Sequence, residues 1–145
     1  MDNDIKSCVR LLSFYEVYNL SIRPKLEAID LFLKESTVPF HVYEVANILE
    51  IETTELSALM ETLGIHELDT VNFFNIVLSA SSAICKLLAS QWRYAKENAY
   101  TPEMIADIYK LNIHKVKHAF QDFGKELITD IELIEIFKRI HLTVF

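Results

Sequence analysis

Glycine and proline are scarce in this chain of 145 residues, which contains two glycines and three prolines. Tight hairpin turns depend on these residues, and no stretch alternates apolar with polar residues for long. The scarcity argues against a fold built from β-hairpins and predicts an all-α protein. Hydrophobic residues make up 51% of the chain and charged residues 24%, so a core can form without disulfides or metals.

Cysteine is also rare, and the chain has only Cys8 and Cys85. Both lie in apolar helical contexts without the spacing of a metal or redox motif, so we interpret them as buried thiols. No glycine-rich loop and no nucleophile with a neighbouring base is apparent, so we predict no catalytic residue and no cofactor. His114, His118 and Asp122 recur at four-residue spacing, a geometry able to chelate a metal, but nothing nearby completes the shell. We therefore predict no metal site.

Long apolar runs are missing as well, because charges interrupt every such stretch before it reaches membrane-spanning length. The chain starts with acidic residues, Asp2 and Asp4, and not with the basic segment of a signal peptide. We expect a cytoplasmic protein with no membrane partner.

Basic residues are absent from one part of the chain. Between Val38 and Ala80 there is no Lys or Arg, and seven acidic residues occur there. From Ser81 onward nine basic residues slightly outnumber eight acidic ones, while the net charge of the whole chain is −7. The two halves should therefore present different electrostatic surfaces.

The segment Thr101–Phe123 has a fainter copy sixty residues upstream, at His41–Leu63. The two copies align without a gap, and the apolar positions agree between them. The chain's two glycines, Gly64 and Gly124, pair at the same offset. The aligned pairs are Val45 with Ile105, Ala46 with Ala106, Ile48 with Ile108, Ile51 with Leu111, Leu56 with Val116, Met60 with Phe120 and Leu63 with Phe123. This pattern predicts a duplicated helical unit.

Capping residues and apolar spacing predict where the helices lie. We expect an N-terminal helix, a helix with Pro24 in its first turn after a cap at Asn19 or Ser21, and a C-terminal helix whose capping box is Thr129 with Glu132. Residues 70–97 form either one long helix or two. The expected helical ranges are 4–18, 24–34, 41–49, 53–63, a segment capped by Asp69, a helix capped by Thr101 with Pro102 and Glu103 in its first turn, a helix capped by Asn112 that ends at Gly124, and 130–140.

These helices predict an orthogonal helical bundle built from two helix-turn-helix-like repeats plus an N-terminal helix. We expect residues 1–20 to form a packing or dimerisation helix, residues 21–80 the acidic first repeat and residues 81–145 the second repeat. Together they should make one compact domain. The apolar tail, Leu142–Phe145, should either dock or fray.

The two copies resemble the helix-turn-helix of DNA-binding regulators. Each has an Ala in its first helix, an apolar residue after the turn and a second apolar residue a few positions later. Where that family often has Gly at the start of the turn, this chain has Glu50 and Lys110. The residues that carry the resemblance are Ala46, Ile51, Glu52 and Leu56 in the first copy, and Ala106, Leu111, Asn112 and Val116 in the second.

The resemblance implies that the second helix of the pair lies in the major groove of double-stranded DNA. In the second copy, helical periodicity places His114, Lys117, His118 and Gln121 outward. Together with Lys110, Asn112 and Lys115 they form the predicted DNA-binding set, since Lys suits phosphate or guanine and Asn and Gln suit adenine. Asp122, at the edge of this face, would oppose a phosphate.

The corresponding outward positions of the first copy are Thr54, Ser57, Ala58 and Glu61, which do not suit a polyanion. Two functions remain open. The chain is either a transcriptional regulator, most naturally a homodimer, that contacts DNA through its second repeat, or a non-enzymatic adaptor. In the second case the acidic first repeat would bind a basic protein partner.

Overall fold

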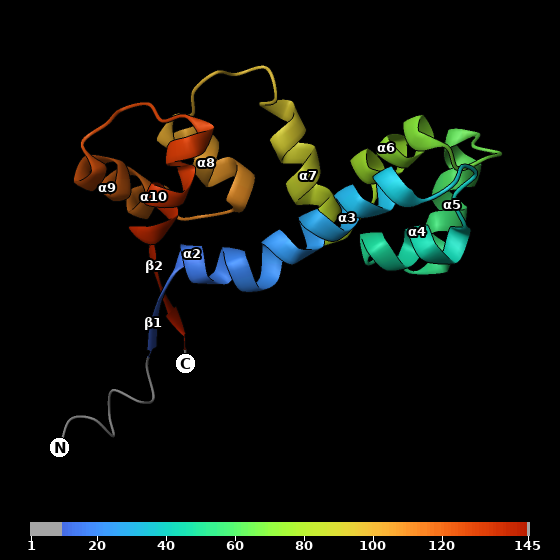
Figure 1. Ribbon diagram of the computed structural model, residues 1–145, viewed down its shortest axis with the longest axis horizontal. Helices are drawn as coiled ribbons and strands as arrows, with labels where there is room; N and C mark the ends of the chain where they lie inside the picture. The colour runs from blue at the N-terminus through green and yellow to red at the C-terminus, as the bar shows by residue number, and fades with distance from the viewer. Residues whose placement is uncertain (1–9, 145) are drawn as a thin grey trace. The chain divides into compact units, whose positions relative to one another are not determined.

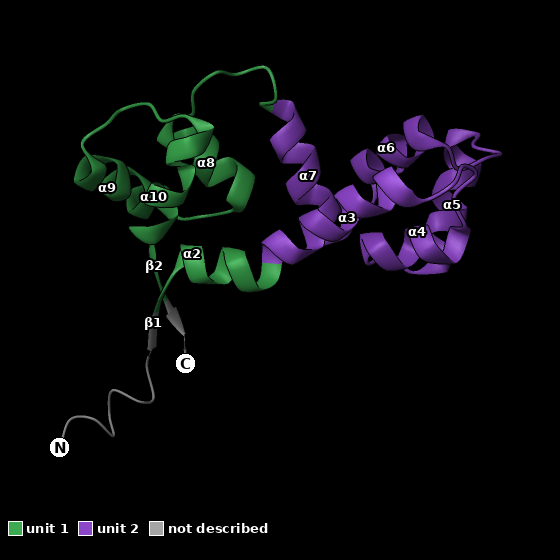
Figure 2. Ribbon diagram, in the orientation of Figure 1, with its two compact units in different colours: residues 1–21, 94–145 green, residues 22–93 purple. Residues whose placement is uncertain are grey.

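The structure is a computed structural model that describes residues 10–144, and it forms two compact units (Figures 1 and 2). Unit 2 runs from Ile22 to Arg93, and unit 1 joins the first 21 residues to Tyr94–Phe145. The chain thus forms two compact units where one compact domain was expected. The boundary lies after Arg93 and not after Ala80, because the helix that follows Ala80 packs against the helix that precedes it.

The fold class is all-α, as predicted, with a small sheet of two four-residue strands. Unit 2 contains five helices: α3 (Arg23–Glu35), α4 (Val42–Leu49), α5 (Thr53–Leu63), α6 (Thr70–Ser79) and α7 (Ala83–Arg93). In unit 1 lie α2 (Phe14–Val17), α8 (Pro102–Tyr109), α9 (Ile113–Phe123), a 3-10 turn at Asp130–Glu132 and α10 (Leu133–Lys138). A π-helical turn, Tyr18–Ile22, leads from α2 to α3.

The N-terminal helix expected over residues 4–18 is wrong at Arg10–Ser13, which is strand β1, and residues 4–9 lie outside the described part of the chain. Strand β1 pairs antiparallel with β2 (His141–Val144) in the C-terminal tail. The predicted alternatives for that tail were docking or fraying, and it docks as a strand. Pairing with a segment far along the chain overrides the local helical pattern.

The start of α3 also differs from the prediction. Pro24 lies in its first turn, as expected, but the N-cap residue is Ile22 and neither Asn19 nor Ser21 caps the helix. The side-chain cap occurs earlier, where Ser13 and Glu16 form a capping box at the start of α2. Unit 1 is closed there by four aromatic rings with centroids 4.8–6.4 Å apart, from Phe14, Tyr18, Tyr109 and Phe137.

Residues 70–97 form two helices, α6 and α7, bent by 105°. The bend is fixed by a side chain from another helix, because the Glu55 carboxylate accepts the Ser81 backbone N–H at 2.8 Å and the Ser81 hydroxyl at 2.7 Å. Ser82 donates its hydroxyl to the Leu49 carbonyl at 2.6 Å and accepts the N–H of Cys85 at 3.3 Å. These bonds satisfy polar groups that a continuous helix would have paired internally.

The sixty-residue offset seen in the sequence also relates the helices of the two units. The bounds of α4 and α5 recur, sixty residues later, as the bounds of α8 and α9. Phe40 donates its N–H to Leu68 at 2.7 Å, and Tyr100 donates to Ile128 at 2.8 Å. Gly64 and Gly124 both end their helices in the left-handed conformation that glycine favours. The two helix pairs thus have matching bounds and a matching backbone hydrogen bond, whereas the duplication itself and the orthogonal arrangement of the bundle stay predictions.

Among residues 10–144, no single helix is both long enough and apolar enough to cross a membrane; α6 and α7 meet that test only as a pair, across their bend.

Candidate nucleic-acid interface

The turn between α8 and α9 brings the predicted DNA-binding residues to the surface of unit 1. Lys110 adopts a left-handed backbone with φ 56° and ψ 48°, and the N–H of Leu111 donates to the Ala106 carbonyl at 3.0 Å. In unit 2, Glu50 has φ 58° and ψ 43°, and Ile51 donates to Ala46, also at 3.0 Å. Both turns thus adopt the conformation for which the resembled family uses glycine, without having glycine.

Asn112 fixes the start of α9. Its side-chain oxygen accepts the backbone N–H groups of His114 at 2.9 Å and Lys115 at 3.2 Å. This cap stabilises the first turn of α9, and it commits the carbonyl oxygen of Asn112 to its own helix. Of the two predicted roles of this residue, capping is the one present in the structure.

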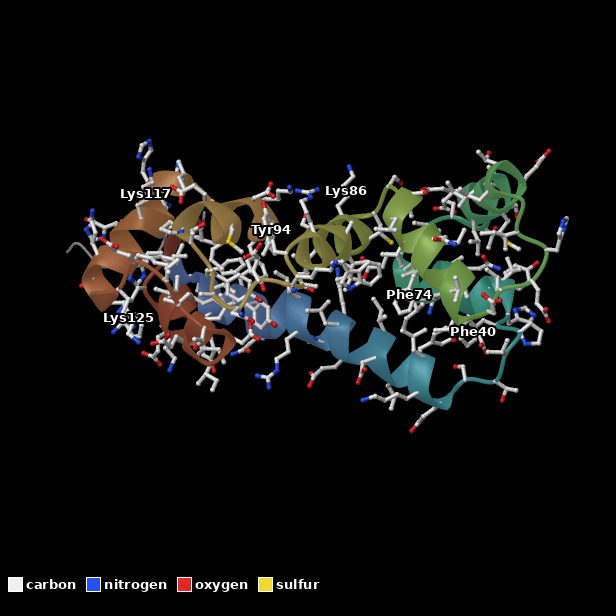
Figure 3. The ribbon with its side chains drawn as sticks, turned by 90° about the horizontal axis from the view of Figure 1, so that it is seen from above. Phe40, Phe74, Lys86, Tyr94, Lys117 and Lys125 are labelled. Atoms are coloured by element: carbon white, nitrogen blue, oxygen red, sulfur yellow. The ribbon has the colours of Figure 1, made fainter. Side chains whose placement is uncertain are left out.

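The division of α9 into inner and outer faces agrees with the prediction. Val116, Ala119 and Phe120 are buried, and Ile113 and Phe123 are half-buried. The side chains of His114, Lys117, His118 and Gln121 are exposed, and Lys117 lies on the outer surface of the helix (Figure 3). The periodicity of α9 places these four side chains side by side over two turns.

All three lysines of the predicted set have partners within unit 1. Lys110 lies 3.6 Å from Asp107, and Lys115 donates to the backbone carbonyl of His141 at 2.8 Å. Lys117 lies 3.6 Å from Glu103, but both of these side chains are at least half exposed. Such a surface pair contributes little to stability, so the Lys117 ammonium can turn to another anion at small cost.

Asp122, expected to repel a phosphate, is paired instead. Arg139 of α10 places its Nε 3.1 Å from the Asp122 carboxylate and its guanidinium 5.0 Å from the centre of the Phe123 ring. It also donates to the backbone carbonyl of Glu135 at 2.8 Å. The sequence contains no signal for this contact, since Arg139 lies seventeen residues beyond Asp122 on another helix. Arg139 is thus shared between two carboxylates, because its Nη1 also lies 3.1 Å from the Glu135 carboxylate.

Among the described residues, the groups that could bind a metal or act as a nucleophile or acid include His114 with His118, Cys85 and Tyr100. No three of their His, Cys, Asp and Glu side chains come together as a metal site requires, so His114 and His118 do not gain further ligands. Cys85 is fully buried, and burial raises the pKa of its thiol, which disfavours the nucleophilic thiolate. Burial and a hydrogen bond to Asp130 raise the pKa of Tyr100 to about 12, so this hydroxyl stays protonated beside the bridge to Ile128.

Sequence reasoning missed one surface feature of unit 2. A hollow of about 610 Å³ opens between the start of α4 and the first turns of α5, lined by residues 39–43, Thr53 and Ser57. Its exposed aromatic residue, Tyr43, lies outside the aligned apolar positions of the two copies and gave no pattern.

Comparison of the whole chain with protein-family models, curated proteins and solved structures finds no match.

Proposed function

We propose that the protein is a regulator whose unit 1 binds double-stranded DNA, with α9 in the major groove. The observation that carries this proposal is the pairing of a left-handed turn at Lys110 with an exposed face of Lys, His and Gln side chains on the following helix. A short connection of this kind lets the second helix of the pair project toward a groove. The pairing of Asp122 with Arg139 lessens the repulsion that this carboxylate would exert on a phosphate.

Binding by one short helix with few phosphate contacts is weak, so the proposal includes a homodimer that reads two half-sites. Half-sites separated by about one helical turn of DNA, roughly 34 Å, would suit such a dimer. A cytoplasmic location accords with this role and is part of the proposal.

The test is binding of duplex DNA by the full chain, measured by fluorescence anisotropy at roughly 50 to 200 mM salt. Lys117→Ala should weaken binding and reduce the slope of log affinity against log salt by about one. Lys138→Ala, at an exposed position of α10, removes the same charge and should leave binding nearly unchanged. Glu61→Ala in unit 2 should also have little effect. No duplex binding at low salt, or equal losses for the two lysine variants, would overturn the proposal.

A second role is favoured by the surface of unit 2, which carries ten acidic against five basic residues. Helix α6 has no charged residue, and it exposes Val71, Phe74 and Leu78 at helical spacing, with 68%, 37% and 58% of each residue exposed. An acidic surface beside exposed apolar side chains suits a basic protein partner. We therefore propose as the alternative an adaptor that binds such a partner through unit 2. Binding of basic proteins by the full chain, weakened by salt, would support it.

A further inference from the structure

The hollow of unit 2 has a counterpart in unit 1 that shows what fits it. At the sixty-residue offset, Tyr43 corresponds to Glu103 and Ser57 to Lys117. In unit 1 the Lys117 ammonium reaches to 3.6 Å from the Glu103 carboxylate and so spans from α9 to the start of α8. In unit 2 Ser57 is too short to span the same gap, and both Tyr43 and Ser57 line an open hollow. Unit 1 therefore fills with its own lysine a place that unit 2 leaves open.

The wall of the hollow is aromatic and held in place. The rings of His41 and Tyr43 stack with centroids 5.3 Å apart and an angle of 28° between their planes. The Nδ1 atom of His41 accepts the backbone N–H of Tyr43 at 3.2 Å, which caps α4 and fixes the imidazole beside the phenol. His41 covers one face of the Tyr43 ring, and because Tyr43 is 68% exposed the opposite face is accessible to a ligand. A cation positioned over such a face is attracted by the ring quadrupole.

The polar groups around the wall also suit a cation. Thr53 and Ser57 supply hydroxyl oxygens that accept hydrogen bonds. Glu61 lies one helical turn beyond Ser57 on the same side of α5 and is exposed. No Lys or Arg occurs between Val38 and Ala80, so this part of the sequence provides no cation of its own to take the place.

We propose that this hollow binds the side chain of a lysine or arginine presented by a basic protein partner. The proposal rests on the adaptor role and specifies its site: the cationic group lies over the Tyr43 ring, near the hydroxyls of Thr53 and Ser57, where Lys117 lies in unit 1.

The site can be tested on the full chain with single amino-acid probes, N-acetyl-arginine amide and N-acetyl-lysine amide, with N-acetyl-glutamine amide as the neutral probe. The full chain is titrated with each probe while its amide chemical shifts are measured. The shifts of residues 41–43 and Ser57 should change saturably with the two cationic probes and should not change with the glutamine derivative. Tyr43→Ala should weaken cation binding about fivefold to tenfold. Val71→Ala, which truncates an equally exposed apolar side chain on α6, should leave it unchanged.

Ser57→Lys gives the sharper test, because it introduces into unit 2 the residue that unit 1 has at this position. The new lysine should occupy the hollow and abolish binding of both probes. Thr62→Lys adds the same charge on another side of α5, at an exposed position, and should lower affinity only slightly. Thermal melting of each variant checks that the fold is kept, which is expected because these positions are exposed.

Equal losses for Ser57→Lys and Thr62→Lys would show general attraction to an acidic surface and would overturn the site. Absence of saturable binding, or shifts spread over all acidic residues, would overturn it too. These outcomes leave the adaptor role standing, because they concern single amino-acid derivatives. Failure of that role would appear separately, as the absence of any binding of basic proteins by the chain.

Discussion

At the scale of single residues, Glu50 and Lys110 have the most informative backbones in this chain. Among the described residues they alone combine a side chain with a positive φ, and they occupy the same place in their two turns. The left-handed conformation costs a residue with a Cβ atom roughly 1–2 kcal/mol relative to the right-handed one. The turn is therefore imposed by the contacts of the flanking helices and not by the residue that makes it.

Replacing Lys110 by Gly should stabilise the protein by about 0.5–1 kcal/mol, because Gly adopts positive φ without strain although it gains entropy in the unfolded chain. Glu50→Gly should stabilise the protein less, since the contact it removes, 3.0 Å from Glu50 to Lys25, is closer than the 3.6 Å contact of Lys110 with Asp107. Urea denaturation measures both variants. Gly124→Ala, at φ 83°, is the converse control and should destabilise the protein by about 1 kcal/mol. A Lys110→Gly variant less stable than the parent chain would contradict this explanation.

At the scale of elements, the predicted capping box of Thr129 with Glu132 is present, but it starts the 3-10 turn Asp130–Glu132 that leads into α10 and not α10 itself. The backbone N–H of Thr129 donates to the Glu132 carboxylate at 3.0 Å, and Lys125 forms an ion pair with the same group. The hydrogen bond from Lys125, followed by that from the Thr129 backbone, lowers the pKa of Glu132. Its charged form is thus favoured by folding, and this stabilisation is present above the unfolded-state pKa, about 4.3, and is lost as pH falls through the folded-state pKa.

Glu132→Gln keeps a residue suited to the capping box but removes the charge. The variant should therefore be less stable than the parent chain at neutral pH, with a difference that begins to shrink as pH falls below about 4.3 and vanishes only below the folded-state pKa of Glu132, which lies lower. Urea denaturation across a pH series checks this. Glu126→Gln, at an exposed position of the preceding loop, is the charge-matched control and should show little effect. A destabilisation by Glu132→Gln that does not vary with pH would mean that packing, and not charge, is responsible.

The bend between α6 and α7 shows why local sequence could not decide the form of residues 70–97. Nothing in Ser79–Ser82 forces a helix to end, since these positions lack glycine and proline. The bend depends on Glu55, which lies twenty-six residues before Ser81 and accepts two hydrogen bonds from it. At the offset of sixty, Lys115 donates to the His141 carbonyl. Glu55 and Lys115 therefore occupy corresponding positions with opposite charges. The Glu55 carboxylate accepts a backbone N–H group, whereas the Lys115 ammonium donates to a backbone carbonyl.

At the scale of the whole molecule, the two units differ in how the chain builds them. Unit 2 is one continuous segment, whereas unit 1 needs the first 21 residues together with the C-terminal part. The core of unit 2 comes from its own helices. It includes five residues with 0% exposure: Leu49, Leu56, Phe73, Ile76 and Cys85.

The isolated segment Ile22–Arg93 should therefore fold alone, with a helical circular dichroism spectrum and a cooperative thermal transition. The segment Tyr94–Phe145 should not, because it lacks β1 and the rings of Phe14 and Tyr18 that complete its aromatic cluster. Comparing the two melting curves is the measurement. A cooperative transition for the second segment, or none for the first, would contradict this division.

The sequence by itself determined the all-α class, the helix pairs at the sixty-residue offset and the inner and outer faces of α9. These features depend on apolar periodicity and on caps such as Asn112 and Asp69, which act within one or two turns of chain. The tertiary structure alone decided the β1–β2 pairing, the bend before α7, the pairing of Asp122 with Arg139 and the hollow beside Tyr43. The first three join residues that are distant in sequence, and the hollow depends on how α4 and α5 pack together. Neither kind of feature leaves a local pattern from which it can be predicted.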